Sequence, residues 1–367
     1  MSGRLSKFGS AIIGLLLASC QSYSAENSQI AQAAPPPAAE GNYLAQPLIS
    51  EIYTADPSAH VWNDGRIYIY PSHDIETGVA EDGAGNHFAM RDYRVLSMYK
   101  VGGKVTLHDV ALDIKDVPWA GRQMWAPDAA YKDGSYYLYS PVKDKSGIFR
   151  LGVATSKSPT GPFKAQPQPM KGSYSIDPAV FRDDDGAHYI YFGGIWGGQL
   201  QKWATGSYDP NGSESDLGQP GAPAIAPKIA RLRGDMLEFD EAPRDILITD
   251  EAGKPLLGGD LDRRFFEGAW VFKRDGLYYF TYSTGETHYL VYATGTSPYG
   301  PFTYRGTILE PVEGWTTHHS ITQHDGQWYL FYHDTQLSGK THLRNVKVAP
   351  LEFDENGQIR TLDPGGK

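Results

Sequence analysis

Residues 325–332 read Asp325-Gly326-Gln327-Trp328-Tyr329-Leu330-Phe331-Tyr332, an Asp-Gly pair followed by a dense run of aromatic and aliphatic residues. The same pattern starts at four earlier pairs: Asp64-Gly65, Asp133-Gly134, Asp185-Gly186 and Asp275-Gly276. Asp-Gly between apolar runs is typical of a tight β-hairpin, because both residues tolerate the positive φ angles that the turn requires. Another short apolar run precedes each pair. Five copies of strand, turn and aromatic strand predict an all-β fold, a five-bladed β-propeller.

The composition agrees with a chain of many short strands. Among 367 residues there are 24 Tyr, 41 Gly and 25 Pro, and we find no long amphipathic pattern with a period of 3.6 residues. The net charge is −10 and the basic residues are scattered, which argues against a nucleic-acid surface. Regular β-repeats fill one domain of this size, so we expect a single propeller domain over residues 47–367.

The first 20 residues resemble a bacterial lipoprotein signal peptide. Arg4 and Lys7 precede an apolar stretch at 11–18, too short to span a bilayer, which ends in Leu17-Ala18-Ser19-Cys20. Cys20 is the only cysteine and would become the lipid-bearing first residue; the alternative is a plain secretory signal with an incidental cysteine. We expect an exported protein of the bacterial cell envelope, periplasmic or at the outer membrane, that touches the membrane only through this lipid.

Two further segments stand out from the repeats. Residues 21–46 are rich in Ser, Ala, Gln and Pro, a composition that predicts a flexible tether. A long segment at about 206–264 separates the third repeat from the fourth, and we expect it to form loops over one face, as we do for the shorter segments at 74–93 and 119–125.

An ionisable residue stands near the start of each predicted innermost strand: Asp56, Asp128, Asp177, Glu267 and His318. In a propeller these positions converge on one mouth of the central channel. One Asp-Pro by itself is commonly a turn, but five convergent ionisable groups are poorly explained by core packing, because a buried charge needs a partner. Facing carboxylates suit hydrolysis of a glycosidic bond, where an ionised one activates water and a protonated one protonates the leaving oxygen.

At these motifs the chain resembles glycoside hydrolase family 43, whose members are five-bladed propellers. The matching segments, in family order, are Ala55-Asp56-Pro57, Met90-Arg91-Asp92-Tyr93, Trp125-Ala126-Pro127-Asp128, Ser175-Ile176-Asp177-Pro178, Phe266-Glu267-Gly268-Ala269, His318-His319-Ser320-Ile321 and Arg344-Asn345-Val346-Lys347-Val348. The resemblance implies that Asp56 is the general base, that Glu267 is the general acid, and that Asp177 modulates the pKa of the acid and orients it. It also implies inversion, with base and acid about 6.5–9.5 Å apart.

Several residues are expected to contact the sugar. Trp125 would stack on the apolar face of a pentose, and Trp196 and Trp270 are further candidates, for which core packing is an equally good explanation. Asp128 is an expected substrate contact at the same mouth of the channel. The resemblance adds Arg344, whose guanidinium group would donate hydrogen bonds to sugar hydroxyls.

The resemblance also implies a calcium ion in the central channel, held by His318 and mostly by water, because calcium prefers oxygen ligands. The alternative is a hydrogen-bonded channel histidine without a metal.

The motifs at 90–93 and 192–201 resemble the single-domain β-xylosidase branch of the family. We therefore expect an exo-1,4-β-xylosidase that acts on xylan-derived oligosaccharides, with the segments at 119–125 and 206–264 closing one end of the cleft. An α-L-arabinofuranosidase is the alternative within the same class. A non-catalytic sugar-binding propeller on the cell surface is the alternative from another class.

Overall fold

The computed structural model describes residues 42–365. The predicted signal peptide at 1–20, with Cys20, lies outside the described residues, as does most of the predicted tether at 21–46. Within 42–365, no helix has the length and hydropathy needed to cross a membrane.

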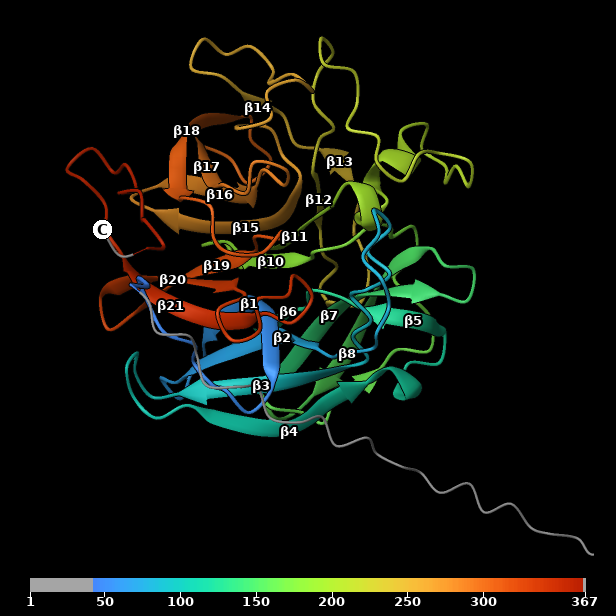
Figure 1. The fold of residues 1–367 in the computed structure, drawn as a ribbon, viewed down its shortest axis with the longest axis vertical. Helices are drawn as coiled ribbons and strands as arrows, with labels where there is room; N and C mark the ends of the chain where they lie inside the picture. The colour runs from blue at the N-terminus through green and yellow to red at the C-terminus, as the bar shows by residue number, and fades with distance from the viewer. Residues whose placement is uncertain (1–41, 366–367) are drawn as a thin grey trace, which may run out of the picture. The chain divides into compact units, whose positions relative to one another are not determined.

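The described residues form five β-sheets, each built mainly from strands that follow one another in sequence (Figure 1). Blade 1 contains β1 (Tyr53–Val61), β2 (Ile67–Asp74), β3 (Asp92–Met98) and β4 (Thr106–Asp113). Blade 2 contains β6 (Asp128–Lys132), β7 (Ser135–Asp144), β8 (Phe149–Ser156) and β9 (Lys164–Ala165), with β5 (Ala120–Met124) added beside the end of β7. Blade 3 contains β10 (Ala179–Arg182), β11 (His188–Phe192), β12 (Lys228–Arg231) and β13 (Arg244–Asp245).

Blade 4 contains β15 (Glu267–Arg274), β16 (Leu277–Ser283), β17 (Leu290–Gly295) and β18 (Phe302–Leu309), with β14 (Ile248–Thr249) parallel to β18. Blade 5 has β19 (His319–His324), β20 (Gln327–Asp334) and β21 (Asn345–Leu351). The helical elements of the described residues are three 3₁₀ turns: η1 (Ile114–Asp116), η2 (Trp196–Gly198) and η3 (Leu200–Trp203).

The innermost strands close a ring. β1 contacts β6, β6 contacts β10, β10 contacts β15, β15 contacts β19, and β19 contacts β1. Figure 1 shows these five strands near the centre, with the later strands of each blade further out. The predicted five-bladed propeller is therefore confirmed.

The Asp-Gly pairs form the predicted turns between the first and second strands of each blade. In blades 2, 4 and 5 both turn residues have positive φ, as in Asp133 (49°) and Gly134 (74°), which is typical of a two-residue type I′ hairpin. In blades 1 and 3 the connection is longer, and only the glycine, Gly65 or Gly186, has positive φ.

Buried tyrosines join neighbouring blades. Tyr70 of blade 1 donates a hydrogen bond to the carbonyl of Pro159 in blade 2, at 2.8 Å, and Tyr191 of blade 3 donates to Pro298 in blade 4, at 2.8 Å. Both Tyr side chains are fully buried, so each ring fills the space between blades while its hydroxyl group finds a partner. The aromatic runs of the sequence thus form the contacts that hold the ring together.

The segment at 206–264 departs from expectation. We predicted loops, but it supplies β12 and β13, the outer two strands of blade 3, and β14 beside blade 4. These strands have only two to four residues, too short for an alternating pattern to be recognised in the sequence.

The N-terminal part of the described chain completes blade 5. The amide of Leu48 donates to the carbonyl of Val346 in β21 at 2.9 Å, and that of Thr54, at the start of β1, donates to the carbonyl of Arg344 at 2.8 Å. Residues 42–46, assigned above to the tether, also contact the propeller: Leu44 donates to Pro364, and the Lys347 ammonium lies 4.1 Å from the centre of the Tyr43 ring. Residues 43 and 44 therefore pack against the propeller.

Candidate active site

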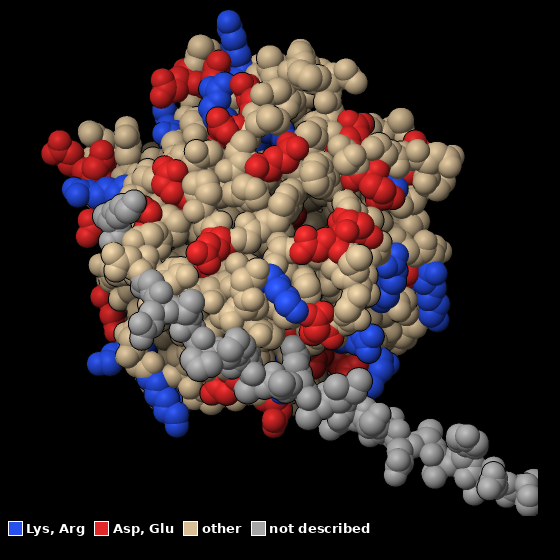
Figure 2. Space-filling view, viewed as in Figure 1, with Lys and Arg blue, Asp and Glu red and all other residues tan. Residues whose placement is uncertain are grey.

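A cavity of about 300 Å³ lies where the innermost strands begin. Every blade contributes to its lining, which includes Asp56, Phe88, Trp125, Asp177, Trp196, Phe266, Glu267, Trp315, His318 and Arg344. The three carboxylates predicted to be catalytic are thus brought to one cavity. On the face seen in Figure 1, acidic side chains gather near a hollow (Figure 2); two acidic residues, Glu81 and Asp82, line the cavity.

Irregular backbone presents the carboxylates to this cavity. The pairing of β1 shifts register between Ala55 and Ser58, around Asp56, and that of β15 shifts between Glu267 and Trp270. Asp56 and Asp177 both have positive φ, at 48° and 55°. A bulge redirects a side chain out of the regular alternation, and strained non-glycine residues cluster at functional sites. At these positions the backbone departs from regular strand pairing, and this departure directs the carboxylates to the cavity.

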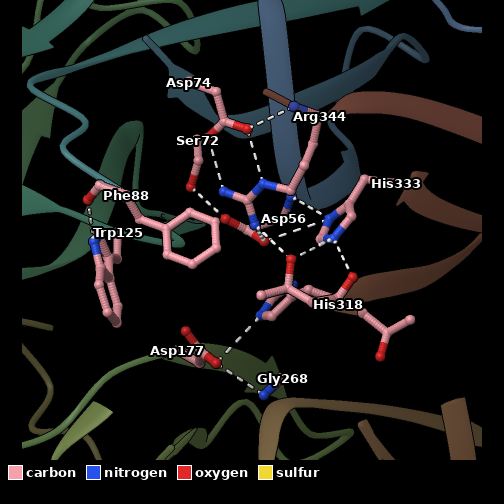
Figure 3. A network of polar contacts seen from close by, with 12 residues as sticks. Asp56, Ser72, Asp74, Phe88, Trp125, Asp177, Gly268, His318, His333 and Arg344 are labelled. Atoms are coloured by element: carbon pink, nitrogen blue, oxygen red, sulfur yellow. Dashed lines mark hydrogen bonds and ion pairs between the residues drawn. The ribbon is translucent and has the colours of Figure 1, made fainter. Parts of the chain in front are cut away.

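Asp56 is held by three contacts (Figure 3). Its Oδ1 accepts a hydrogen bond from Arg344 Nη1 at 2.8 Å, its Oδ2 accepts from Ser72 Oγ at 2.7 Å, and its backbone amide donates to His333 Nδ1 at 3.0 Å. Burial by itself would raise the pKa of Asp56, but the Arg344 charge and the hydrogen bond from Ser72 lower it to about 2. Asp56 is therefore ionised at neutral pH, as a general base must be.

Arg344 is itself fixed by Asp74. Its Nε and Nη2 atoms donate to the two Asp74 oxygens, each at 2.8 Å, in a bidentate pair, and Thr316 Oγ1 accepts from Nη1 at 3.1 Å. The Phe88 ring lies 4.9 Å from the guanidinium carbon. Most of the Arg344 donors are therefore committed to carboxylates of the protein. Its contact with sugar hydroxyls stays a prediction, whereas its contact with Asp56 is direct.

Asp177 and Glu267 differ from Asp56 in their surroundings. Burial, together with the negative charges of Glu267 and Asp56, raises the pKa of Asp177 well above its usual value. Burial and the charge of Asp56 likewise raise the pKa of Glu267 to about 8. Asp177 Oδ2 accepts a hydrogen bond from the Gly268 amide at 2.8 Å, whereas the Glu267 carboxyl group makes no hydrogen bond with any described residue. Glu267 is thus the protonated group that is free to meet a substrate oxygen.

One wall of the cavity consists of residues 81–90, between β2 and β3, packed on Trp125. Trp125 Nε1 donates to the Phe88 carbonyl at 2.7 Å, and the Phe88 and Trp125 rings meet nearly at right angles. A Cβ atom at Gly85, which has a φ of +67°, would lie 2.6 Å from the Trp125 ring, so only glycine fits this close approach. Trp125 lines the cavity as predicted.

Another part of the lining is aromatic. The Trp196 and Trp315 rings are stacked, with centroids 5.3 Å apart, and the Phe266 ring lies at a steep angle to both. Phe266 directly precedes Glu267, which places this cluster beside the proposed acid. Trp196 was predicted at the site. Trp315 and Phe266 were not assigned a role there.

Two of the predicted residues are not brought to the cavity. Asp128 is fully buried and pairs with blades 1 and 3; its Oδ1 lies 2.6 Å from His60 Nε2 of β1, and its Oδ2 accepts from the Val180 amide of β10 at 2.6 Å. Because Asp128 lies within the regular ladder of β6 rather than on a bulge, it faces neighbouring blades, and we withdraw it as a substrate contact. Trp270 donates to the Ile321 carbonyl at 2.9 Å and belongs to the core.

The expected origin of the walls is also corrected. Trp119 packs in the core of blade 2, close to Gly152, and none of residues 206–264 lines the cavity. Of the segment at 119–125 only Trp125 lines the cavity, and the other walls come from residues 81–90, from 195–198 and 266 between strands of blades 3 and 4, and from 315, 316 and 341 of blade 5.

His318 lines the cavity. Its Nε2 is 3.7 Å from Asp177 Oδ2, and both ring nitrogens are buried without a hydrogen-bond partner among the described residues. Buried polar atoms normally have a partner, often water or an ion. The described residues contain no group of three or more His, Cys, Asp or Glu side chains that would hold a metal on its own.

The chain is similar to known proteins over nearly all of the described part. The sequence model for glycosyl hydrolases family 43 matches residues 45–359. Xylosidase/arabinosidase 43A of Humicola insolens is 56% identical over 325 residues, covering 87% of this chain and 99% of that protein. A β-xylosidase of Xylanibacter ruminicola is 50% identical over 318 residues, covering 84% of this chain and 97% of that protein.

Solved structures of family 43 enzymes are also similar to this chain. A family 43 β-xylosidase/α-arabinofuranosidase from a compost microbial metagenome, in complex with xylotriose and in a calcium-free form, has a TM-score of 0.86 and 63% identity, covering 89% of this chain and 98% of that one. A GH43_1 enzyme from Xanthomonas citri complexed with xylotriose has a TM-score of 0.83 and 52% identity, covering 89% and 96%. The chain therefore belongs to glycoside hydrolase family 43.

Proposed function

We propose that this glycoside hydrolase is an inverting exo-1,4-β-xylosidase, which removes single xylose units from the non-reducing ends of xylan-derived oligosaccharides. The observation that carries the proposal is the different surroundings of two carboxyl groups in one cavity: Arg344 and Ser72 bind Asp56, whereas the Glu267 carboxyl group has no hydrogen-bond partner among the described residues. Arg344 keeps Asp56 ionised, and burial near Asp56 keeps Glu267 protonated. Inverting hydrolysis needs this pairing of a base and an acid.

In the proposed reaction, Asp56 accepts a proton from a water molecule as that water attacks the anomeric carbon. Glu267 donates its proton to the glycosidic oxygen as the bond to the leaving sugar breaks, and the electron pair of that bond stays on the leaving oxygen. Asp177 acts through position: by accepting from the Gly268 amide it fixes the backbone next to Glu267, and its negative charge, when present, disfavours ionisation of Glu267.

The walls support exo action. The leaving sugar must lie on the side of Glu267, where Trp196 and Trp315 offer an aromatic surface on which a sugar ring can stack. Residues 81–90 include Phe88, whose ring lies against Arg344, on the side of the base. We therefore place the non-reducing end of the substrate against these residues.

An α-L-arabinofuranosidase activity is the second candidate. Relatives in Humicola insolens and Bacteroides ovatus, at 56% and 54% identity, carry the name xylosidase/arabinosidase. Membership of a hydrolase family and the three carboxylates in one cavity weigh against a propeller that only binds sugar.

The test is hydrolysis of 4-nitrophenyl β-D-xyloside and 4-nitrophenyl α-L-arabinofuranoside, together with xylobiose, by the purified enzyme. We expect xylose release from both xylosides, with a higher kcat/KM for the β-xyloside than for the arabinofuranoside. A higher kcat/KM for the arabinofuranoside would reverse the substrate assignment. Binding of xylobiose without turnover of any pentoside would favour a sugar-binding protein.

We also propose that calcium binds in the channel at His318. The unpartnered buried nitrogens of His318 fit a bound ion or its water shell, and because the described residues provide no further ligand cluster, water would supply most of the oxygen ligands that calcium prefers. When bound, the ion would favour the ionised form of nearby carboxylates.

Removal of calcium with EDTA is expected to lower the melting temperature, because an ion that binds only the folded state stabilises it. Adding calcium after EDTA treatment should restore the melting temperature of the wild type. It should not raise the melting temperature of a His318→Ala variant. If neither EDTA nor added calcium moves the melting temperature of the wild type, His318 does not hold calcium.

We further propose, from the sequence of residues 1–20, that the protein is exported and lipid-anchored through Cys20. Mass spectrometry of the mature N-terminus should find a diacylglyceryl group on Cys20. An unmodified N-terminus at another residue would indicate a plain secretory signal.

A further inference from the structure

His87 lines the cavity but has no part in the acid–base chemistry described above. We propose that His87 recognises the substrate, with its Nε2–H group donating a hydrogen bond to a hydroxyl group at the non-reducing end of the bound xylosyl unit. This inference rests on the proposed function and identifies a specificity residue within the same cavity.

The protonation of the ring follows from its contact with Asp82. His87 Nδ1 accepts a hydrogen bond from the Asp82 amide at 3.2 Å, so Nδ1 carries no proton and the proton of the neutral ring is on Nε2. Burial lowers the pKa of His87, against the nearby charges of Glu81 and Asp82, which raise it; His342 and Arg344 lower it further. The ring therefore presents one donor, and always the same one.

That donor has no protein partner within residues 42–365, where His87 Nε2 makes no hydrogen bond, although the residue is only 6% exposed. Its surroundings include ring contacts with Phe88, at 4.2 Å between centroids, and His342, at 6.1 Å. Because His87 lines the cavity and its Nε2 is not among the fully enclosed polar atoms without a partner, this donor can gain a partner when a sugar hydroxyl group enters the cavity.

The segment that carries His87 is held in place. Gln123 Nε2 donates to the carbonyls of Gly85 and Phe88, at 2.8 and 3.0 Å, and Arg122 Nη1 donates to Asn86 Oδ1 at 2.6 Å. Blade 2 thus fixes residues on both sides of His87. A preorganised donor distinguishes a substrate that has the matching hydroxyl group from one that lacks it, because the latter leaves the donor unpaired.

The position of His87 selects the part of the sugar that it meets. Its neighbour Phe88 lies against Arg344, which binds the proposed base Asp56, whereas the Trp196–Trp315 pair lies beside the proposed acid. The leaving sugar occupies the acid side. The hydroxyl groups within reach of His87 are therefore those at C3 or C4 of the xylosyl unit to be released.

Two substitutions separate the donor from the ring. His87→Phe keeps an aromatic ring beside Phe88 but has no donor, whereas His87→Gln keeps an amide donor near the position of Nε2. For 4-nitrophenyl β-D-xyloside we expect kcat/KM to fall about 3- to 10-fold in His87→Phe, mainly through KM, as for loss of one hydrogen bond. His87→Gln should keep most of the wild-type kcat/KM. His108→Phe, on β4 and outside the cavity lining, is the matched control and should keep the wild-type value.

Deoxy substrates make the test specific. We expect either the 3-deoxy or the 4-deoxy xyloside to be hydrolysed by the wild type and by His87→Phe with similar kcat/KM, because the hydroxyl partner of the donor is missing from it. An equal loss in His87→Phe on the parent and on both deoxy substrates would overturn the proposal, as would a loss that His87→Gln does not reduce. If the wild type hydrolysed no xyloside, the proposed function would fail, and calorimetric binding of xylose to the wild type and His87→Phe would still decide whether His87 contacts the sugar.

Discussion

Replacement of Glu267 with glutamine is expected to lower kcat on xylobiose by about 10²- to 10⁴-fold, the usual contribution of a general acid. The amide keeps the size of the side chain but has no proton to give to the leaving oxygen. The loss should be smaller on 4-nitrophenyl β-D-xyloside, because nitrophenolate leaves with little help from an acid. Parallel measurements of kcat on the two substrates check this difference.

The pH dependence of kcat for the wild type and for Glu267→Gln gives a second test of the role of Glu267. Glu267 must be protonated to act, and its pKa is raised to about 8, so wild-type kcat should fall as the pH rises through about 8. The Glu267→Gln variant should lack this basic limb. Glu352→Gln, an exposed residue just beyond β21, serves as the control and should keep both rate and profile. A variant with equal losses on both substrates and an unchanged basic limb would show that Glu267 is not the acid.

Replacement of Asp56 with asparagine is expected to lower kcat by about 10²- to 10⁴-fold as well, because the water molecule loses its general base. Affinity for xylobiose should change little, since the amide side chain has the same size as the carboxylate and Arg344 would remain bound to Asp74. Initial rates and calorimetric titration with xylobiose measure the two quantities separately.

Asp64→Asn, at the far end of β1 in an exposed turn, is the control for this substitution and should leave kcat unchanged. If Asp56→Asn turned over xylobiose at the wild-type rate, Asp56 would be removed from the role of base. A fall in affinity without a fall in kcat would assign it to binding.

The sequence was most informative where local geometry needs particular residues. The Asp-Gly turns require positive φ, which few residue pairs tolerate, so the hairpins and the propeller followed from them. Asp56, Asp177 and Glu267 stand next to Pro or Gly at irregular backbone, and the same irregularity brings them to the cavity. For these three residues, the adjacent Pro or Gly that marks them in the sequence also belongs to the irregular backbone that brings their side chains to the cavity.

Asp128 illustrates where that reasoning fails. Its motif, Trp125-Ala126-Pro127-Asp128, resembles those of the other blades, but the strand is regular from Asp128 onward, and the side chain turns to His60 and the Val180 amide. Whether an inner-strand residue reaches the cavity depends on a shift of one residue in register. The sequence alone does not determine that shift.

The residues that orient Asp56 were missed for a related reason. Ser72 and Asp74 alternate on β2, so both face the same side as Asp56 and Arg344. Two polar residues at this spacing at the end of an apolar strand are a signal that was present in the sequence. Trp315 gave no such signal, because its stacking on Trp196 joins loops of blades 5 and 3 that lie far apart in the chain.

The central claim is that Asp56 and Glu267 act as base and acid across one bound xylosyl unit, with water as the direct nucleophile. Proton NMR during the first minutes of hydrolysis of 4-nitrophenyl β-D-xyloside tests it most directly, because it identifies the anomer released before mutarotation. A single displacement by water predicts α-xylose as the first product. Initial release of β-xylose would mean a covalent intermediate and would contradict the roles assigned to both carboxylates.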